Sequence, residues 1–115
     1  MSALTVYGIT SCDTCRKALK WLDEHGREYR WHDLRVDGLE REAIERWLTA
    51  VGADELVNRR STTWRGLDES ARAAAADTDG AIDLMLDHPT LIKRPLFVAE
   101  GQVLVGFNAA VRDKL

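Results

Sequence analysis

The first part of the chain predicts a strand, a loop, a helix and a second strand, and this order constrains the fold more than any other feature. Residues Leu4 to Ile9 are rich in β-branched and aromatic side chains, which is typical of a strand. The polar run Thr10 to Thr14 interrupts that pattern. From about Thr14 to His25 the apolar residues recur at helical spacing, and Tyr29 to Asp33 then alternates as a strand does. The sequence therefore predicts a β-loop-α-β unit.

The rest of the chain predicts several helices, then a hairpin and a last helix. The expected helices cover residues 39–51, 67–76 and 81–87, with a polar loop at 58–64 and a turn at 77–80. Strands are expected at 96–99 and 103–105, followed by a helix that Asn108 caps. The order βαβ, helices, ββα predicts an α/β protein of thioredoxin-like fold. Its mixed four-stranded sheet would carry a helical insertion at about residues 39–88, within a single domain spanning residues 1–115.

Composition narrows the class of function. A chain of 115 residues suits one domain, and its formal net charge of −3 comes from mixed charges without a basic block. We therefore expect no direct binding of nucleic acid. No apolar stretch approaches the roughly 20 residues that span a bilayer, and the amino terminus lacks the pattern of a secretory signal. We expect a cytoplasmic monomer that does not bind membranes.

Two cysteines separated by two residues stand where the first strand gives way to the helix. Cys12 comes just before the predicted helix, and Cys15 lies one turn later on its apolar face. The start of a helix offers unpaired N–H groups and a positive dipole end, and both lower the pKa of a thiol. Cys12 is therefore the expected exposed nucleophile. Cys15 is the expected shielded thiol that resolves a mixed disulfide.

Two other interpretations of the thiols remain open. Free cysteines are often small buried hydrophobic residues without a reaction. A Cys-x-x-Cys pair can also form half of a zinc site, which His25, His32 or His88 would complete. The chain holds no second Cys-x-x-Cys pair and no His-x₃₋₅-His pair, so we expect no bound metal.

Arg94 immediately precedes Pro95 at the start of a predicted strand. In a thioredoxin-like fold, a cis-proline at this point faces the thiol motif, and X–Pro bonds adopt cis at low cost. Arg94 would then lie near Cys12, where it would stabilise the thiolate or hold an anionic group of the substrate. The alternative is an ordinary surface arginine. Arg60, in the polar loop, is open to the same two interpretations.

Four segments together resemble the ArsC-like family of arsenate reductases and their relatives. They are residues 6–18, 60–65, 91–96 and 105–108, in the family's order. The last resembles the Spx and YffB-type branches. In the glutaredoxin-linked arsenate reductases, one cysteine and three arginines form the site. Cys12, Arg60 and Arg94 match the first three positions, whereas the segment Gly106 to Asn108 holds no arginine.

The resemblance implies two functions of different classes. The first is a thiol-disulfide oxidoreductase that uses glutathione as cosubstrate, acts on a small thiol or protein disulfide, and works with glutaredoxin or thioredoxin. Its catalytic residues would be Cys12, Cys15 and Arg94, and its substrate-binding residues would be Arg60, Pro95, Ser11, Asp13 and Thr14. The alternative is an Spx-like regulator that binds the α subunit of RNA polymerase and switches through its disulfide.

Two short segments each favour one of these functions. Residues 62–65 resemble the YffB branch, which favours the enzyme. Residues 52–55 resemble a segment near the polymerase contact of Spx, although Gly52 is equally explained as a helix stop. Arsenate reduction is the third and least favoured function, because one of the three arginines is unmatched.

Overall fold

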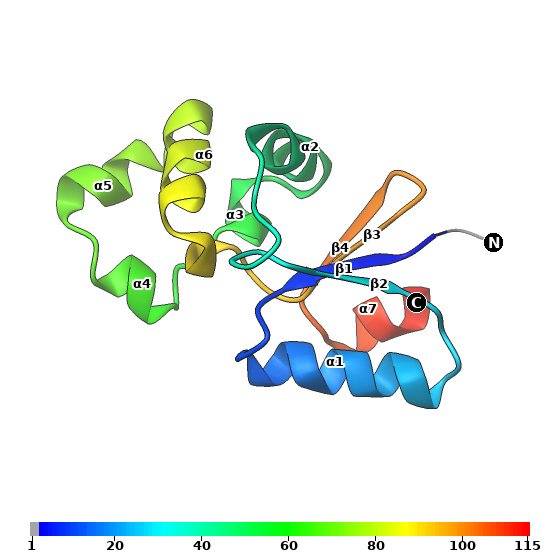
Figure 1. Ribbon diagram of the computed structural model, residues 1–115. Coiled ribbons are helices and arrows are strands. Elements are labelled where there is room, and N and C mark those ends of the chain that lie inside the picture. Colours follow the sequence, from blue (N-terminus) through cyan, green and yellow to red (C-terminus); the bar gives the residue numbers. More distant parts are fainter. Residues whose placement is uncertain (1–2) are drawn as a thin grey trace. The chain divides into compact units, whose positions relative to one another are not determined.

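The computed structural model describes residues 3–115, and these divide into two compact units. One unit runs through Gly38 and resumes at Arg94–Leu115, and the other is Leu39–Lys93 (Figure 1). Both cysteines belong to the first unit. Within the described residues, no helix has the length and apolar character needed to cross a membrane.

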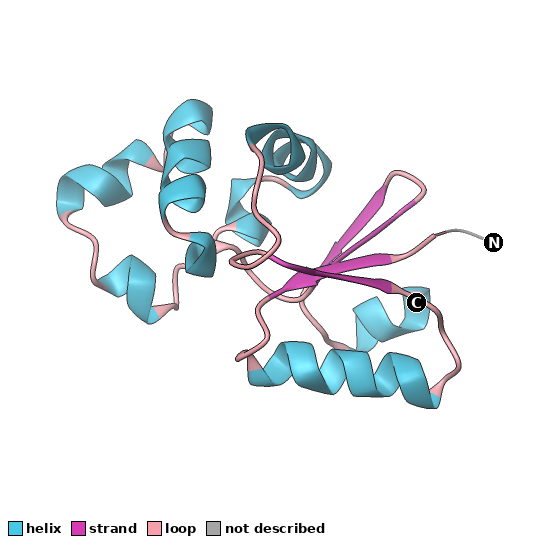
Figure 2. Ribbon diagram, viewed as in Figure 1, coloured by secondary structure: helices cyan, strands magenta, loops and turns pink. Residues whose placement is uncertain are grey.

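The first unit contains one four-stranded sheet and two helices. Its elements are β1 (Thr5–Gly8), α1 (Asp13–Glu24), β2 (Arg30–Asp33), β3 (Leu96–Ala99), β4 (Gln102–Val105) and α7 (Ala109–Lys114). The strand order is β2-β1-β3-β4, with β1 parallel to β2 and the other two pairings antiparallel (Figure 2). The expected α/β class, mixed four-stranded sheet and thioredoxin-like fold are confirmed. Asn108 caps α7 as expected, because its Oδ1 accepts the N–H of Val111 at 2.9 Å.

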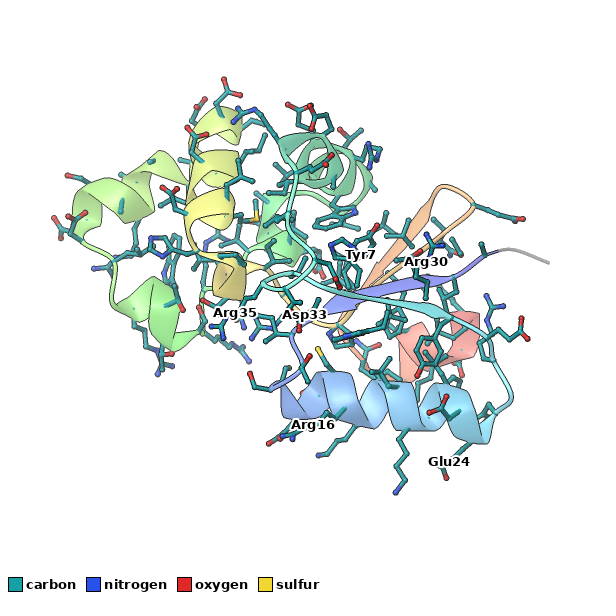
Figure 3. The ribbon with its side chains drawn as sticks, viewed as in Figure 1. Tyr7, Arg16, Glu24, Arg30, Asp33 and Arg35 are labelled. Atoms are coloured by element: carbon teal, nitrogen blue, oxygen red, sulfur yellow. The ribbon has the colours of Figure 1, made fainter. Side chains whose placement is uncertain are left out.

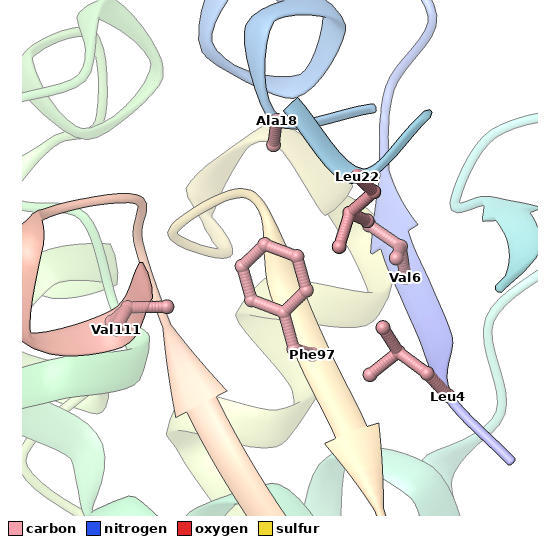
Figure 4. Packing of buried hydrophobic residues seen from close by; sticks show 6 residues of the cluster. All are labelled: Leu4, Val6, Ala18, Leu22, Phe97 and Val111. Carbon is pink, nitrogen blue, oxygen red and sulfur yellow. The ribbon is translucent and has the colours of Figure 1, made fainter. Parts of the chain in front are cut away.

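The core of this unit forms where α1 and α7 cover one face of the sheet (Figure 1). Strand residues that alternate onto this face meet the apolar sides of both helices. The buried cluster is formed by Leu4, Val6, Ala18, Leu22, Phe97 and Val111 (Figure 4). Burying a large apolar side chain contributes about 1.5–3 kcal/mol to the free energy of unfolding. The same face of α1 that supplies Ala18 and Leu22 also buries Cys15.

The second unit is helical. It contains α2 (Arg41–Val51), α3 (Ala53–Leu56), α4 (Thr62–Arg65), α5 (Glu69–Ala74), α6 (Thr78–Asp87) and the 3₁₀ turn η1 (Pro89–Leu91). Gly52 ends α2 with a φ of +82°, so the expected helix stop is confirmed.

Two local expectations in the second unit are wrong. The polar loop at 58–64 contains the start of helix α4, because Ser61 Oγ accepts the N–H of Trp64 at 3.1 Å and caps a helical turn. The expected turn at 77–80 is the first turn of α6, because Asp77 caps it through the N–H of Gly80 at 3.2 Å. In both places a residue typical of turns acts as a helix cap.

Candidate functional site

The two cysteines occupy the start of α1, and both are free thiols. Cys12 is the N-cap residue and is partly exposed, whereas Cys15 is fully buried in the first turn. The backbone N–H and the thiol of Cys15 both hydrogen-bond to the sulfur of Cys12. The expected division into an accessible and a shielded thiol is confirmed as a matter of position.

The surroundings of Cys12 favour its thiolate. Partial burial raises the pKa of Cys12, but hydrogen bonds from Cys15 and from Arg94, together with the charge of Arg94, outweigh burial. The net result is a pKa below the ordinary value of a cysteine. Since the thiolate is the nucleophilic form, Cys12 is the more reactive sulfur at neutral pH.

Cys15 is held in the opposite protonation state. Burial raises the pKa of Cys15 to about 12, and the neighbouring Cys12 adds to that rise. The backbone N–H of Ile9, which points at the sulfur, only partly offsets these effects. The pair therefore combines a thiolate-prone sulfur with a protonated sulfur that donates to it.

A second segment, Arg94 and Pro95 just before β3, contributes to the site beside the thiols of α1. The Arg94–Pro95 peptide bond is cis, as expected, and leads directly into β3. The side chain of Arg94 hydrogen-bonds to Cys12 and places a positive charge beside its sulfur. The alternative of an ordinary surface arginine does not fit this contact.

Replacing Arg94 by alanine should raise the pKa of Cys12, because the thiolate loses both a donor and a positive charge. The pH dependence of Cys12 alkylation, followed by mass spectrometry in a Cys15→Ser background, measures this pKa. Arg94→Lys keeps the charge and should shift the pKa less. Lys93→Ala, which removes an exposed neighbouring cation, is the matched control. An unchanged titration in Arg94→Ala would remove Arg94 from the site.

The other expected site residues are divided between the two units. Ser11, Asp13 and Thr14 are exposed around the start of α1, and Asp13 forms an ion pair with Arg16. In this ion pair the negative charge of Asp13 and the positive charge of Arg16 offset each other near the thiols. Arg60 is an exposed residue of the second unit, where its backbone N–H donates to Asn58 Oδ1 at 3.1 Å.

Two of the three histidines considered as zinc ligands, His25 and His32, make other contacts. His25 Nδ1 lies 2.8 Å from the carbonyl oxygen of Trp21, and His32 Nε2 lies 2.7 Å from that of Gly38. Over residues 3–115, no group of three or more His, Cys, Asp or Glu side chains is arranged to hold a metal ion.

A residue that the sequence analysis missed lies at the end of β2. Asp33, whose side chain is labelled in Figure 3, is only 3% exposed. Its carboxylate accepts four hydrogen bonds. Oδ2 accepts the backbone N–H and the hydroxyl of Thr10, at 2.9 and 2.6 Å. Oδ1 accepts the N–H groups of Arg35 and Val36, at 2.8 and 3.0 Å. The sequence held one signal for this residue. Asp33 ends the predicted strand Tyr29 to Asp33, and in a β-loop-α-β unit this strand lies beside the strand that leads to the thiols.

Asp33 should make the free energy of unfolding depend on pH in acid. Burial raises the pKa of Asp33, but the four hydrogen bonds outweigh it and lower the pKa from 3.8 to about 2. The stabilisation is therefore present above pH 3.8 and is lost as the pH falls toward about 2. We expect a loss of about 2 kcal/mol over this range. Denaturant unfolding at several pH values measures it, and Asp33→Asn should lack this part of the slope.

Comparisons with known proteins show the family of this chain. A model of the ArsC family matches residues 7–115. An uncharacterized protein of Haemophilus influenzae is 50% identical over 105 residues, which cover 91% of each chain. The global transcriptional regulator Spx of Listeria monocytogenes is 31% identical over 91% of this chain and 80% of its own. The solved structure of a YFFB protein is 42% identical, with a TM-score of 0.91 and 97% of each chain covered. The chain belongs to the ArsC family.

Proposed function

We propose that this protein is a thiol-disulfide oxidoreductase that uses glutathione as its reductant. The observation that carries the proposal is the asymmetry of the two thiols. Cys12 is accessible, has a lowered pKa and contacts Arg94, whereas Cys15 is buried and protonated. This combination suits a nucleophile and a resolving thiol. Two structurally inert cysteines would need no such difference.

The proposed first step is attack by the Cys12 thiolate on one sulfur of a substrate disulfide. A Cys12–substrate disulfide forms, the substrate S–S bond breaks, and the other substrate sulfur leaves as a thiolate that takes a proton. Cys12 is then uncharged, so its contribution to the raised pKa of Cys15 is removed. Cys15 loses its proton to solvent or to the leaving thiolate and attacks Cys12. The second substrate sulfur leaves as a thiolate that takes a proton from solvent, and a Cys12–Cys15 disulfide remains.

Two molecules of glutathione would complete the cycle. The first attacks Cys12, which releases Cys15 as a thiol and leaves glutathione on Cys12. The second attacks that glutathione sulfur, which releases the Cys12 thiolate and glutathione disulfide. The two electrons lost by glutathione equal the two gained by the substrate. Such a cycle needs a compartment in which thiols are kept reduced, so we propose a cytoplasmic location.

The remaining site residues would act on the substrate. Arg94 would stabilise the Cys12 thiolate and receive an anionic group of glutathione or of the substrate. Ser11, Asp13 and Thr14 are exposed and would line the approach to Cys12, whereas Pro95 is fully buried and would act only through its neighbour Arg94. Arsenate is the less favoured substrate, because a third arginine is missing from the segment Gly106 to Asn108.

A glutathione titration tests the proposal. The protein is oxidised to its Cys12–Cys15 disulfide, mixed with glutathione at defined ratios of thiol to disulfide, and analysed by mass after acid quenching. We expect the intramolecular disulfide to be replaced by a transient glutathione adduct on Cys12 and then by the free dithiol. A disulfide that stays intact at every glutathione ratio would contradict the proposal. The Cys15→Ser variant, which cannot close the disulfide, serves as the control: it should form the glutathione adduct on Cys12 when glutathione disulfide is in excess and lose it when glutathione is in excess.

A second candidate function is a redox-switched regulator that binds the α subunit of RNA polymerase. It is favoured by the similarity to Spx proteins, which are named as global transcriptional regulators. Pull-down of the purified α subunit with the oxidised and the reduced protein separates the candidates. Capture that depends on the redox state would favour the regulator, whereas glutathione turnover without capture would favour the oxidoreductase.

A further inference from the structure

The peptide group between Ile9 and Thr10 is held on both of its sides. Its oxygen accepts the backbone N–H of Cys12 at 2.9 Å, and its nitrogen donates to Asp33 Oδ2 at 2.9 Å. Because a peptide group is planar, fixing the N–H also fixes the direction of the oxygen. Asp33 therefore sets the orientation of the Ile9–Thr10 peptide group, whose oxygen accepts the hydrogen bond from the backbone N–H of Cys12.

Pairing of β1 with β2 explains why Asp33 can do this from a distant part of the sequence. Gly8 and Asp33 are register partners in the parallel pair, and the N–H of Leu34 donates to Gly8 O at 2.8 Å. The ends of both strands therefore lie at the same edge of the sheet. The carboxylate of Asp33 reaches the loop that leads from β1 to the thiols (Figure 3).

The four groups that bond to the carboxylate of Asp33 come from three residues and are all arranged as donors, and this requires a carboxylate. Arg35 and Val36 are in the turn after β2, so their bonds to Oδ1 explain only a local turn. Oδ2 instead accepts the N–H and the hydroxyl of Thr10, which is 23 residues away in the sequence. An asparagine would have to direct its NH₂ group toward one of these pairs of donors. Only the hydroxyl of Thr10 could reverse its role, and the backbone N–H of Thr10 could not.

We propose that Asp33 is a positioning residue that holds the Ile9–Thr10 peptide and so keeps the Cys12 sulfur within reach of its donors. This deepens the proposed function, on which it rests, by naming the group that aligns the nucleophile. The donors concerned are the N–H of Cys15 and the side chain of Arg94, both of which stabilise the thiolate. Asp33 stays ionised and takes no proton during the reaction, because its four hydrogen bonds favour the charged form.

A positioning role and a purely electrostatic role predict opposite results. If the negative charge of Asp33 acted on Cys12 directly, its removal would lower the pKa of Cys12 and speed alkylation at neutral pH. If Asp33 positions the loop, its removal misaligns the donors and slows alkylation. Small misplacements of reacting groups cost about tenfold or more in rate.

The test measures the rate of Cys12 alkylation by iodoacetamide against pH in the full chain, with Cys15→Ser as the background. We expect Asp33→Asn to slow alkylation at pH 7 by about tenfold and to shift the pH profile upward. Asp37→Asn is the matched control, since the carboxylate of Asp37 accepts the N–H of Asp33, at 2.8 Å, and asparagine can accept that bond. It should alkylate within about twofold of the background protein.

Thr10→Val provides a second, milder variant. It removes the hydroxyl bond and keeps the backbone bond, so alkylation should slow by a smaller factor, and it decides the matter if Asp33→Asn does not fold. Circular dichroism confirms that each variant is folded. Alkylation in folded Asp33→Asn or in Thr10→Val as fast as in the background protein would overturn the proposal. Because alkylation needs no glutathione, this result is independent of whether the glutathione cycle operates.

Discussion

Replacing Cys12 by serine should reduce thiol-disulfide exchange by a factor of about 10³ or more, because the hydroxyl cannot replace the thiolate as nucleophile. Replacing Cys15 by serine should instead leave a protein that attacks once and stops as a mixed disulfide on Cys12. The reason is that Cys12 retains its exposure and its contact with Arg94, whereas the group that resolves the intermediate is absent.

The measurement is a comparison of turnover and of trapped adducts by mass spectrometry. With glutathione present, wild-type protein should show turnover and Cys12→Ser should not. Without glutathione, Cys15→Ser should hold one equivalent of substrate adduct on Cys12, whereas Cys12→Ser should hold none. Cys15→Ala is a useful control, because it removes the same thiol without leaving a hydroxyl in the buried site. Equal residual turnover in the Cys12 and Cys15 variants would contradict the two-thiol mechanism.

Replacing Gly8 by alanine should lower the free energy of unfolding by about 1–3 kcal/mol, which is the usual cost of overpacking a core. A Cβ atom at Gly8 would lie 2.5 Å from Cys15 Sγ and 2.9 Å from Cη2 of Trp31. Both groups would have to move, and neither is the end of a flexible surface chain. Denaturant unfolding measures the change through the transition midpoint.

A double-mutant cycle shows whether the sulfur causes this loss. Cys15→Ala removes the closer of the two atoms, so Gly8→Ala should cost less in that background than in the wild type. Gly66→Ala is the control, because its added Cβ would meet only ordinary contacts, beginning at 3.4 Å. Equal costs of Gly8→Ala in the two backgrounds would show that Cys15 is not the obstacle. A lower cost in the Cys15→Ala background would show that Gly8, the last residue of β1, leaves the space in which Cys15 is buried.

Local patterns in the sequence account for most of the elements. The strands of the first unit, helix α1 and the capped helix α7 follow from side-chain periodicity and from capping residues such as Asn108, which act over a few residues. Ser61 and Asp77 are exceptions, because a residue that favours a turn is also a good helix cap. The helical turns that these residues start depend on which backbone N–H their side chains reach.

The thiol pair shows the same division between local and distant information. The sequence by itself determined that Cys12 starts a helix and that Cys15 lies on its apolar face, because both follow from spacing along one helix. Only the tertiary structure decided that Arg94 contacts Cys12 and that Asp33 holds the loop before it. These contacts join segments far apart in the chain, and the pairing of β1 with β2 and β3 brings them to one edge of the sheet. The pairing of strands that are distant in the sequence, which the pattern within any one strand does not specify, is the physical reason that they meet.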